Sequence, residues 1–170
     1  MDTLAPSIQT ITVSRLVIGV LALLVSFNTV AESYEATVIG ITDGDTVHVL
    51  RNSHTEVKIR LSEIDAPEKA QPWGRQSKQA LSDLVYRQIV KVDVVTTDRY
   101  GRTVAKLIRD DGLDANAEMV RSGNAWVYRK YMLDHGLLDL ETSARNAHRG
   151  LWSLPEEQIM SPWEWRRQSH

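Results

Sequence analysis

The stretch that decides the fold is residues 36–50, which read ATVIGITDGDTVHVL. Residues 36–42 and 46–50 are rich in β-branched side chains, which favour extended strands. Asp43, Gly44 and Asp45 separate the two runs, and a glycine between them suits a tight turn with a positive φ. The stretch therefore predicts a β-hairpin with Asp45 in its turn.

Further strands and helices follow along the chain. Residues 56–61 alternate polar and apolar side chains, and residues 89–96 and 103–109 form two more strand-like runs. The spacing of apolar side chains predicts helices over residues 77–86, 114–121 and 134–148. Apolar residues along the last helix, at spacings of four and three, are expected to lie in the core: Leu133, Leu137, Leu140, Ala144, Ala147 and Leu151.

Five strands combined with three helices indicate an α+β domain. Five short antiparallel strands can close as a small Greek-key barrel of the OB type. The number of strands alone does not select that barrel.

Three short runs carry the side chains best suited to chemistry: TDGDT at residues 42–46, RLSEIDAPE at 60–68 and DRYGR at 98–102. Asp45 in the first run and Asp65 in the second can supply the oxygen ligands that a hard divalent cation prefers. The plainer interpretation is that Asp45 is a turn residue and Asp65 caps a loop.

The same runs also hold cationic groups for a phosphate. The planar guanidinium groups of Arg60 and Arg102 match pairs of phosphate oxygens, and Glu68 remains as a candidate general base. Together with a metal ion, these groups can neutralise a phosphodiester, activate a water and stabilise a more highly charged transition state. The alternative is a structural ion pair between Arg60 and Glu68.

In order and spacing, these runs resemble the staphylococcal (micrococcal) nuclease, or thermonuclease, family of calcium-dependent nucleases, over residues 34–152. The resemblance implies a five-stranded OB-fold barrel with three α-helices. It also implies endonuclease cleavage of DNA and RNA with little sequence preference, leaving 3′-phosphate ends. The positions that match the family's motifs are Asp45, Asp65 and the carbonyl of Ala66 for Ca²⁺, and Arg60, Glu68 and Arg102 for catalysis.

The resemblance further implies contacts to bound nucleotide. Tyr100 matches a tyrosine near the 5′-phosphate, and Arg99 replaces a lysine, which keeps the charge but changes its geometry. A nucleotide-stacking tyrosine is expected at Tyr128 or Tyr131. The segment WVYR at residues 126–129 departs from the family pattern and leaves that register open.

The two ends of the chain are expected to lie outside the domain at residues 32–154. Arg15, the apolar residues 16–25 and the small residues up to Ala31 resemble a secretory signal peptide over residues 1–31. This predicts a periplasmic or secreted protein, with an uncleaved membrane anchor as the alternative. Residues 155–170 form a C-terminal tail rich in tryptophan and arginine, expected to pack on its own domain or fray rather than bind bases or phosphates.

Composition narrows the function classes. The 170 residues carry a formal net charge of −2 and no cysteine, which excludes disulfides, thiolate zinc sites and cysteine nucleophiles. An acidic chain must concentrate its positive charge locally, or use a metal, to hold nucleic acid. The partners expected are DNA and RNA, single strands preferred, with a monomeric protein and no obligate protein partner.

Two other functions compete with the nuclease. OB-type barrels also bind single strands without cleaving them, but such a module does not need the complete set of two aspartates, one glutamate and two arginines. A membrane-anchored interaction domain is the third possibility.

Overall fold

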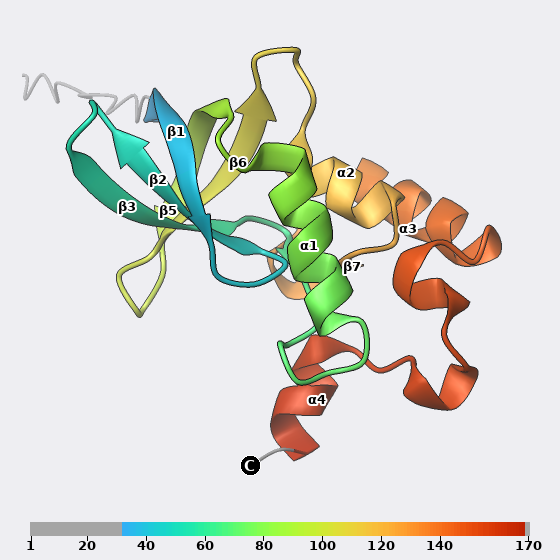
Figure 1. The fold of residues 1–170 in the computed structure, drawn as a ribbon. Coiled ribbons are helices and arrows are strands. Elements are labelled where there is room, and N and C mark those ends of the chain that lie inside the picture. Colours follow the sequence, from blue (N-terminus) through green and yellow to red (C-terminus); the bar gives the residue numbers. More distant parts are fainter. Residues whose placement is uncertain (1–31, 169–170) are drawn as a thin grey trace, which may run out of the picture.

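The computed structural model describes residues 32–168, and the predicted signal peptide lies outside the described residues. Five strands form a closed barrel in the order β1-β2-β3-β6-β5, with the helices gathered along one side (Figure 1). The strands are β1 (Ser33–Ile41), β2 (Thr46–Arg51), β3 (Thr55–Leu61), β5 (Ile89–Thr97) and β6 (Thr103–Arg109). The predicted α+β class and OB-fold barrel are confirmed.

Strand β1 closes the barrel because it pairs with two neighbours. Its second half runs antiparallel to β2, as the predicted hairpin requires, and its first half runs antiparallel to β5. A register shift between Val38 and Gly40 marks an irregularity in the long strand. Such bulges bend a strand and increase its twist, which helps a sheet curve into a barrel.

The barrel interior follows from the alternation of side chains along each strand. Every second residue points inward and is apolar. These fully or almost fully buried residues are Ala36, Val38, Val47, Val49, Ile59, Leu61, Val90, Val92, Ala105 and Leu107.

The pairing of β3 with β6 is parallel and places Arg60 opposite Val104. Arg102 precedes Val104 by two residues, and residues two apart share one face of a strand. The barrel register therefore brings the two predicted phosphate-binding arginines to adjacent strands at one end of the barrel.

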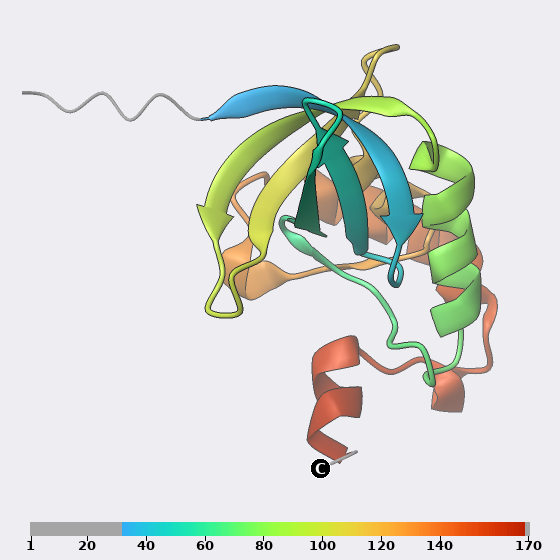
Figure 2. The same ribbon diagram turned by 60° about the vertical axis from the view of Figure 1, so that its left-hand side comes forward.

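Four α-helices lie outside the barrel: α1 (Gly74–Val85), α2 (Ala115–Arg121), α3 (Gly136–Asn146) and α4 (Pro162–Gln168). The first three confirm the predicted helices, with shifted ends. Asp114 is the N-cap of α2 and accepts a 3.0 Å hydrogen bond from the backbone N–H of Ala117. The fourth helix lies in the tail, below α1 in Figures 1 and 2.

Several short elements complete the domain. A second sheet pairs β4 (Ile64–Asp65) with β7 (Trp126–Val127). Single 3₁₀ turns follow at η1 (Arg129–Tyr131), η2 (Gly150–Ser153) and η3 (Glu156–Gln158). In residues 32–168, no helix has the length and apolar character needed to span a membrane.

The predicted core stripe along α3 is correct except at Leu133 and Ala147. Leu137, Ala144 and Leu151 are buried and Leu140 is partly buried, but Leu133 is 73% exposed and Ala147 is also exposed. Leu133 and Ala147 lie outside α3, which begins at Gly136 and ends at Asn146. Helical spacing therefore does not place these two side chains on the buried face.

A second apolar cluster joins the helices to the tail. Trp126, Ala144, Leu151 and Trp152 form its buried part, and Trp73, Ile159 and Trp163 pack against it. The tail therefore packs on its own domain, as expected.

Candidate active site

Asp45 lies buried in the turn between β1 and β2. Its Oδ2 accepts a 2.8 Å hydrogen bond from the backbone N–H of Ala66, and its Oδ1 accepts one from the Thr46 hydroxyl at 3.0 Å. A Cβ at Gly44 would lie 1.9 Å from Ser77 Oγ and 2.7 Å from the Cβ of Ala66. Gly44 does not have a positive φ, so this close approach, and not the predicted backbone conformation, is the reason for glycine.

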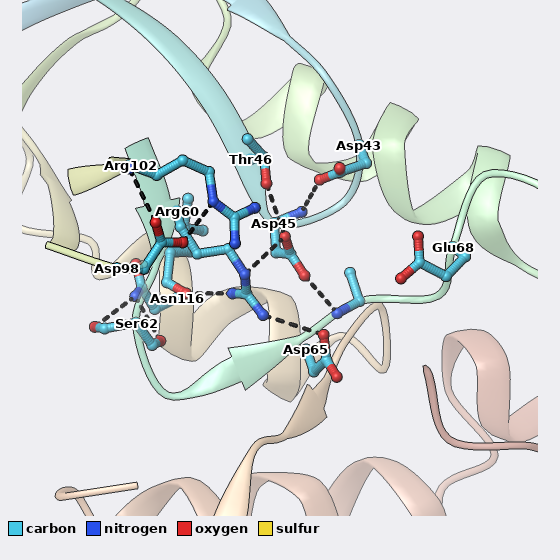
Figure 3. Close-up of polar contacts among 12 residues, drawn as sticks. Asp43, Asp45, Thr46, Arg60, Ser62, Asp65, Glu68, Asp98, Arg102 and Asn116 are labelled. Atoms are coloured by element: carbon cyan, nitrogen blue, oxygen red, sulfur yellow. Dashed lines mark hydrogen bonds and ion pairs between the residues drawn. The ribbon is translucent and has the colours of Figure 1, made fainter. Parts of the chain in front are cut away.

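Arg60, on β3, lies between two carboxylates (Figure 3). Its Nε is 3.3 Å from Asp45 Oδ1 and its Nη2 is 3.1 Å from Asp65 Oδ1, and its side chain is only 12% exposed. Its Nη1 donates to the carbonyl of Leu61. Within residues 32–168 Arg60 forms no ion pair with Glu68, so the structural pair considered as an alternative is absent.

Asp65 lies in β4, where pairing with β7 sets it opposite Trp126. Besides Arg60 it has a second guanidinium partner, because Arg166 of α4 donates from Nη2 to Oδ2 at 2.7 Å and from Nη1 to Oδ1 at 3.3 Å. Burial raises the pKa of Asp65, and the neighbouring Asp45 carboxylate adds to this rise, although Arg166 and Arg60 oppose it. The pKa of Asp65 therefore stays raised even though two arginines bind its carboxylate.

Asp43 adds another acidic group beside Asp45. Its Oδ1 accepts the backbone N–H of Asp45 at 3.1 Å, and burial together with the Asp45 carboxylate raises the pKa of Asp43 to about 6. When ionised, the connected group carries four negative charges and two positive ones: Asp43, Asp45, Asp65 and Glu68 against Arg60 and Arg166.

This local excess of negative charge fits a divalent cation. In the described part of the chain, no three acidic or histidine side chains converge as a complete metal cage. The carboxylate oxygens of Asp45 and Asp65 meet at Arg60, and the backbone N–H of Ala66 donates to Asp45. Oxygen donors suit hard cations such as Ca²⁺, which also accept water ligands.

Glu68 lies on the loop between β4 and α1, at the edge of the cluster, and its side chain is 39% exposed. Its backbone N–H donates to Gln71 Oε1 at 3.0 Å. A Cβ at Gly74 would lie 1.9 Å from the Glu68 carbonyl oxygen, so the loop packs closely on the start of α1. The carboxylate Oε1 accepts a 2.7 Å hydrogen bond from Arg166 Nη1, which links it to Asp65.

Arg102 immediately precedes β6, as predicted, next to the turn that holds Arg99 and Tyr100. Asp98 fixes this turn, because its Oδ1 accepts the backbone N–H groups of Tyr100 and Arg102, both at 2.9 Å. Its Oδ2 accepts the Arg102 Nε–H at 2.7 Å. Gly101 has a φ of 77°, a value that favours glycine. Within residues 32–168 the side chain of Arg102 is bonded only through Nε, so its two Nη groups can donate to an anion.

Arg99 and Tyr100 form the exposed part of the same turn. Arg99 Nη2 donates to the Tyr100 hydroxyl at 2.6 Å, and its guanidinium carbon lies 4.8 Å from the ring centroid. The ring of Tyr100 is 69% exposed. A cation and an aromatic ring thus stand together at the surface, near Arg102.

Tyr128 lies apart from the turn, next to the tail. Its ring stacks on Trp163, with centroids 5.8 Å apart and planes at 5°, and meets Tyr131 edge-on at 5.0 Å. Tyr131 is 56% exposed. Both tyrosines therefore have an aromatic partner on the protein, and Tyr131 is the more exposed of the two.

Three contacts at or near the site were missed from the sequence. Asp98 holds Arg102, four residues away, a spacing that is visible in the sequence. Glu63 is buried, and its Oε1 accepts the N–H groups of Leu133 and Asp134, both at 2.6 Å. No sequence pattern indicates that contact, or the one between Arg166 and Asp65.

The described geometry gathers carboxylates and guanidinium groups at one end of an OB-type barrel, an arrangement suited to binding a phosphate beside a metal ion. Asp45 contacts Ala66 and Arg60 directly, and Arg60 also contacts Asp65. Glu68 joins them through Arg166.

Comparison with known proteins agrees with this arrangement. Residues 58–154 match the family described as staphylococcal nuclease homologue. An uncharacterized endonuclease of Escherichia coli is 43% identical over 129 residues, which cover 76% of this chain and 82% of that protein. A micrococcal nuclease of Shigella flexneri is 41% identical over 165 residues, covering 91% and 92%. An uncharacterized endonuclease of Haemophilus influenzae is 40% identical over 137 residues, covering 81% and 75%. Since the family match spans more than half of the chain, this protein belongs to the staphylococcal nuclease family.

Proposed function

We propose that this protein is a calcium-dependent endonuclease that hydrolyses phosphodiester bonds of DNA and RNA and leaves 3′-phosphate ends. The observation that carries the proposal is the partly buried Arg60 held between Asp45 and Asp65 at the barrel end where Glu68 and Arg102 also lie. Family membership supports nuclease activity, and the acidic cluster supports a metal requirement.

Asp45, Asp65 and the carbonyl of Ala66 would hold the calcium ion. When bound, the ion supplies positive charge that offsets the charge of the phosphate and of the acidic cluster. A bound cation would also offset the Asp45 charge, which adds to burial in raising the pKa values of Asp43 and Asp65.

Arg60 and Arg102 bind the scissile phosphate from adjacent strands. Guanidinium groups hold the non-bridging oxygens more tightly as negative charge grows in the transition state. The partners of each arginine fix its orientation before substrate arrives: two aspartates for Arg60 and Asp98 for Arg102. Preorganised donors of this kind lower the barrier because they need not reorient during the reaction.

Glu68 accepts a proton from the attacking water. The water oxygen bonds to phosphorus as the bond between phosphorus and the 5′ oxygen breaks. The departing 5′ oxygen takes up a proton from solvent to become a hydroxyl, and the phosphate stays on the 3′ oxygen. The Glu68 carboxylate is 39% exposed and uses one oxygen, Oε1, to bind Arg166. Its other oxygen can face a water.

Arg99, Tyr100 and Tyr128 are proposed to bind the nucleotides next to the scissile bond. Tyr100 is exposed beside the cationic Arg99, which suits a phosphate and a base. The bases of a single strand are unpaired and can reach these side chains more freely than the bases of a duplex. We therefore propose a preference for single strands. The protein is proposed to act as a monomer in the periplasm or outside the cell.

The test is cleavage of single-stranded DNA, double-stranded DNA and RNA by the purified protein with calcium, with magnesium and with a chelator. We expect cleavage with calcium, loss of cleavage with chelator, and 3′-phosphate ends on the products. Binding of single strands without cleavage under any metal would instead identify a binding module. Cleavage that persists in the chelator would contradict the metal requirement alone.

A further inference from the structure

Arg166 brings a third guanidinium to the site from the far end of the chain. Its Nη1 lies 2.7 Å from Glu68 Oε1 and 3.3 Å from Asp65 Oδ1, and its Nη2 lies 2.7 Å from Asp65 Oδ2. One side chain therefore bridges the proposed base and a proposed metal ligand.

The helix that carries Arg166 is fixed to the domain by aromatic packing. In α4, Trp163 meets Trp126 edge-on with ring centroids 5.7 Å apart, and it stacks on Tyr128. Just before the helix, the carbonyl of Met160 accepts a 2.6 Å hydrogen bond from Gln71 Nε2. Ser161 and Pro162 are buried. These contacts make α4 part of the domain.

Glu68 needs an external partner to hold its carboxylate in one place. It lies on a loop, and its side chain is 39% exposed. Within residues 32–168 the only hydrogen bond to its carboxylate comes from Arg166. An exposed glutamate without such a bond samples several rotamers, and ordering it costs conformational entropy.

We propose that Arg166 is a positioning residue of the nuclease reaction, which holds the Glu68 carboxylate at a fixed place relative to Asp65 and leaves Glu68 Oε2 free to accept the proton of the attacking water. The proposal rests on the proposed function. The planar fork of arginine suits this task because one guanidinium can serve two carboxylates at once, which the ammonium of lysine does with less directional control.

A contrasting possibility is that Arg166 blocks the site and is displaced by substrate. The packing of Trp163 and the buried Ser161 favour the positioning role, because a blocking segment must move away and α4 is docked through buried groups. The two roles predict opposite changes in rate when Arg166 is removed.

The experiment compares Arg166→Gln, Arg166→Lys and a matched control, Arg167→Gln, in a calcium-containing cleavage assay. Arg167 is the next residue, has a side chain that is 73% exposed and is 3.9 Å from Glu164. We expect Arg166→Gln to lower kcat about 10- to 100-fold with KM changed less than about threefold, since small displacements of a reacting group cost this much. Arg166→Lys should recover part of the loss, and Arg167→Gln should match the wild type.

The same substitution in a Glu68→Gln background separates positioning from a general structural effect. If Arg166 acts through Glu68, the second substitution should lower the residual rate by less than about threefold, because the two residues act as one unit. Thermal unfolding of each variant shows whether the fold persists, and Arg166→Lys keeps a cation beside Asp65 if the glutamine variant does not fold.

Four outcomes would overturn the inference. They are a wild-type rate for Arg166→Gln, an increased rate, an equal loss in both Glu68 backgrounds, and a loss in KM alone. In all four the wild type still cleaves, so the proposed function stands. A folded wild-type protein that does not cleave would overturn the proposed function and the inference with it.

Discussion

Arg60 and Arg166 both bind Asp65, but they belong to different kinds of structure. Arg60 lies on β3 near one end of the barrel, paired on one side with Thr46 and on the other with Val104, and its side chain is 12% exposed. Arg166 lies in a seven-residue helix, its side chain is 40% exposed, and it is 101 residues from Asp65 in sequence.

The difference separates two ways of fixing a charged group. Backbone ladders on both sides hold Arg60, so its place is set by the same register that closes the barrel. The helix that carries Arg166 is held by the packing of Trp163 in a small aromatic cluster. We call Asp45, Arg60 and Asp65 the barrel half of the site, and Arg166 with its helix α4 the tail half. Substitutions in the barrel half should therefore change both stability and rate, and substitutions in the tail half should change mainly the rate.

The largest effect is expected for Arg60→Ala. The change removes a phosphate-binding group and leaves Asp45 and Asp65 facing each other without their shared cation. We expect kcat to fall about 1,000-fold or more and the free energy of unfolding to fall by about 3 kcal/mol, because both carboxylates are buried. Cleavage rates and urea unfolding measure the two effects.

The control for this substitution is Arg51→Ala. Arg51 forms a surface pair with Glu32 at 2.8 Å, with both side chains well exposed, so its loss should cost less than about 1 kcal/mol. Equal stability losses for the two variants would mean that the ion pairs of Arg60 stabilise the fold no more than a surface pair does.

Glu68→Gln should lower kcat about 100- to 1,000-fold while leaving the unfolding temperature close to that of the wild type. The amide cannot accept the proton, but it keeps the size of the side chain and an oxygen for Arg166. The measurement is kcat alongside thermal unfolding, with Glu56→Gln, at an exposed surface pair with His48, as the control. A folded variant with the wild-type rate would exclude Glu68 as the base.

The sequence predicted the barrel half of the site far better than the tail half. Alternating apolar residues and the hairpin stretch identify the strands, and Asp45, Arg60 and Asp65 lie in or next to them. The strands β4 and β7 have two residues each, too few to leave a detectable period. The docking of α4 depends on Trp163 meeting a surface built from other parts of the chain, which no local pattern describes.

Gly44 shows the same limit of prediction from the sequence at a single residue. Gly44 was predicted to serve a positive φ, but the structure requires it because Ser77 and Ala66 leave no room for a Cβ. A tertiary contact, invisible along the sequence, fixes the identity of a residue in the hairpin turn.

Trp163→Ala should loosen the tail half without opening the barrel. Losing the packing on Trp126 and Tyr128 frees α4, so kcat should fall about tenfold through misplacement of Arg166. Hydrogen exchange should speed up in residues 162–168 and stay slow in the barrel strands. Trp163→Phe keeps an aromatic ring at this position and should retain most of the rate. Faster exchange throughout β1–β6 would mean that the two halves unfold together.

The smallest effect is expected at Asp98, which holds Arg102 on the barrel side. Asp98→Asn keeps an oxygen for the backbone N–H groups of Tyr100 and Arg102 but loses the charged partner of Arg102 Nε, so kcat should fall a few-fold, to about tenfold at most. Arg102 stays present, which is why the loss should be smaller than for Arg102→Ala. Asp111→Asn, at another exposed turn pair, is the control.

The contribution of Asp98 to folding stability depends on pH, and the sign of that dependence follows from the hydrogen bonds of its carboxylate. Partial desolvation of Asp98 raises its pKa, but the N–H groups of Arg102 and Tyr100 outweigh this and hold the pKa below the ordinary value. A carboxyl with a lowered pKa stabilises the folded state fully above its unfolded pKa of about 4, and loses that contribution as the pH falls through the folded value. The stability difference between wild type and Asp98→Asn should thus be constant from about pH 6 upward and shrink below about pH 4. A difference that grows on acidification would mean that the Asp98 carboxylate does not hold Arg102 in solution.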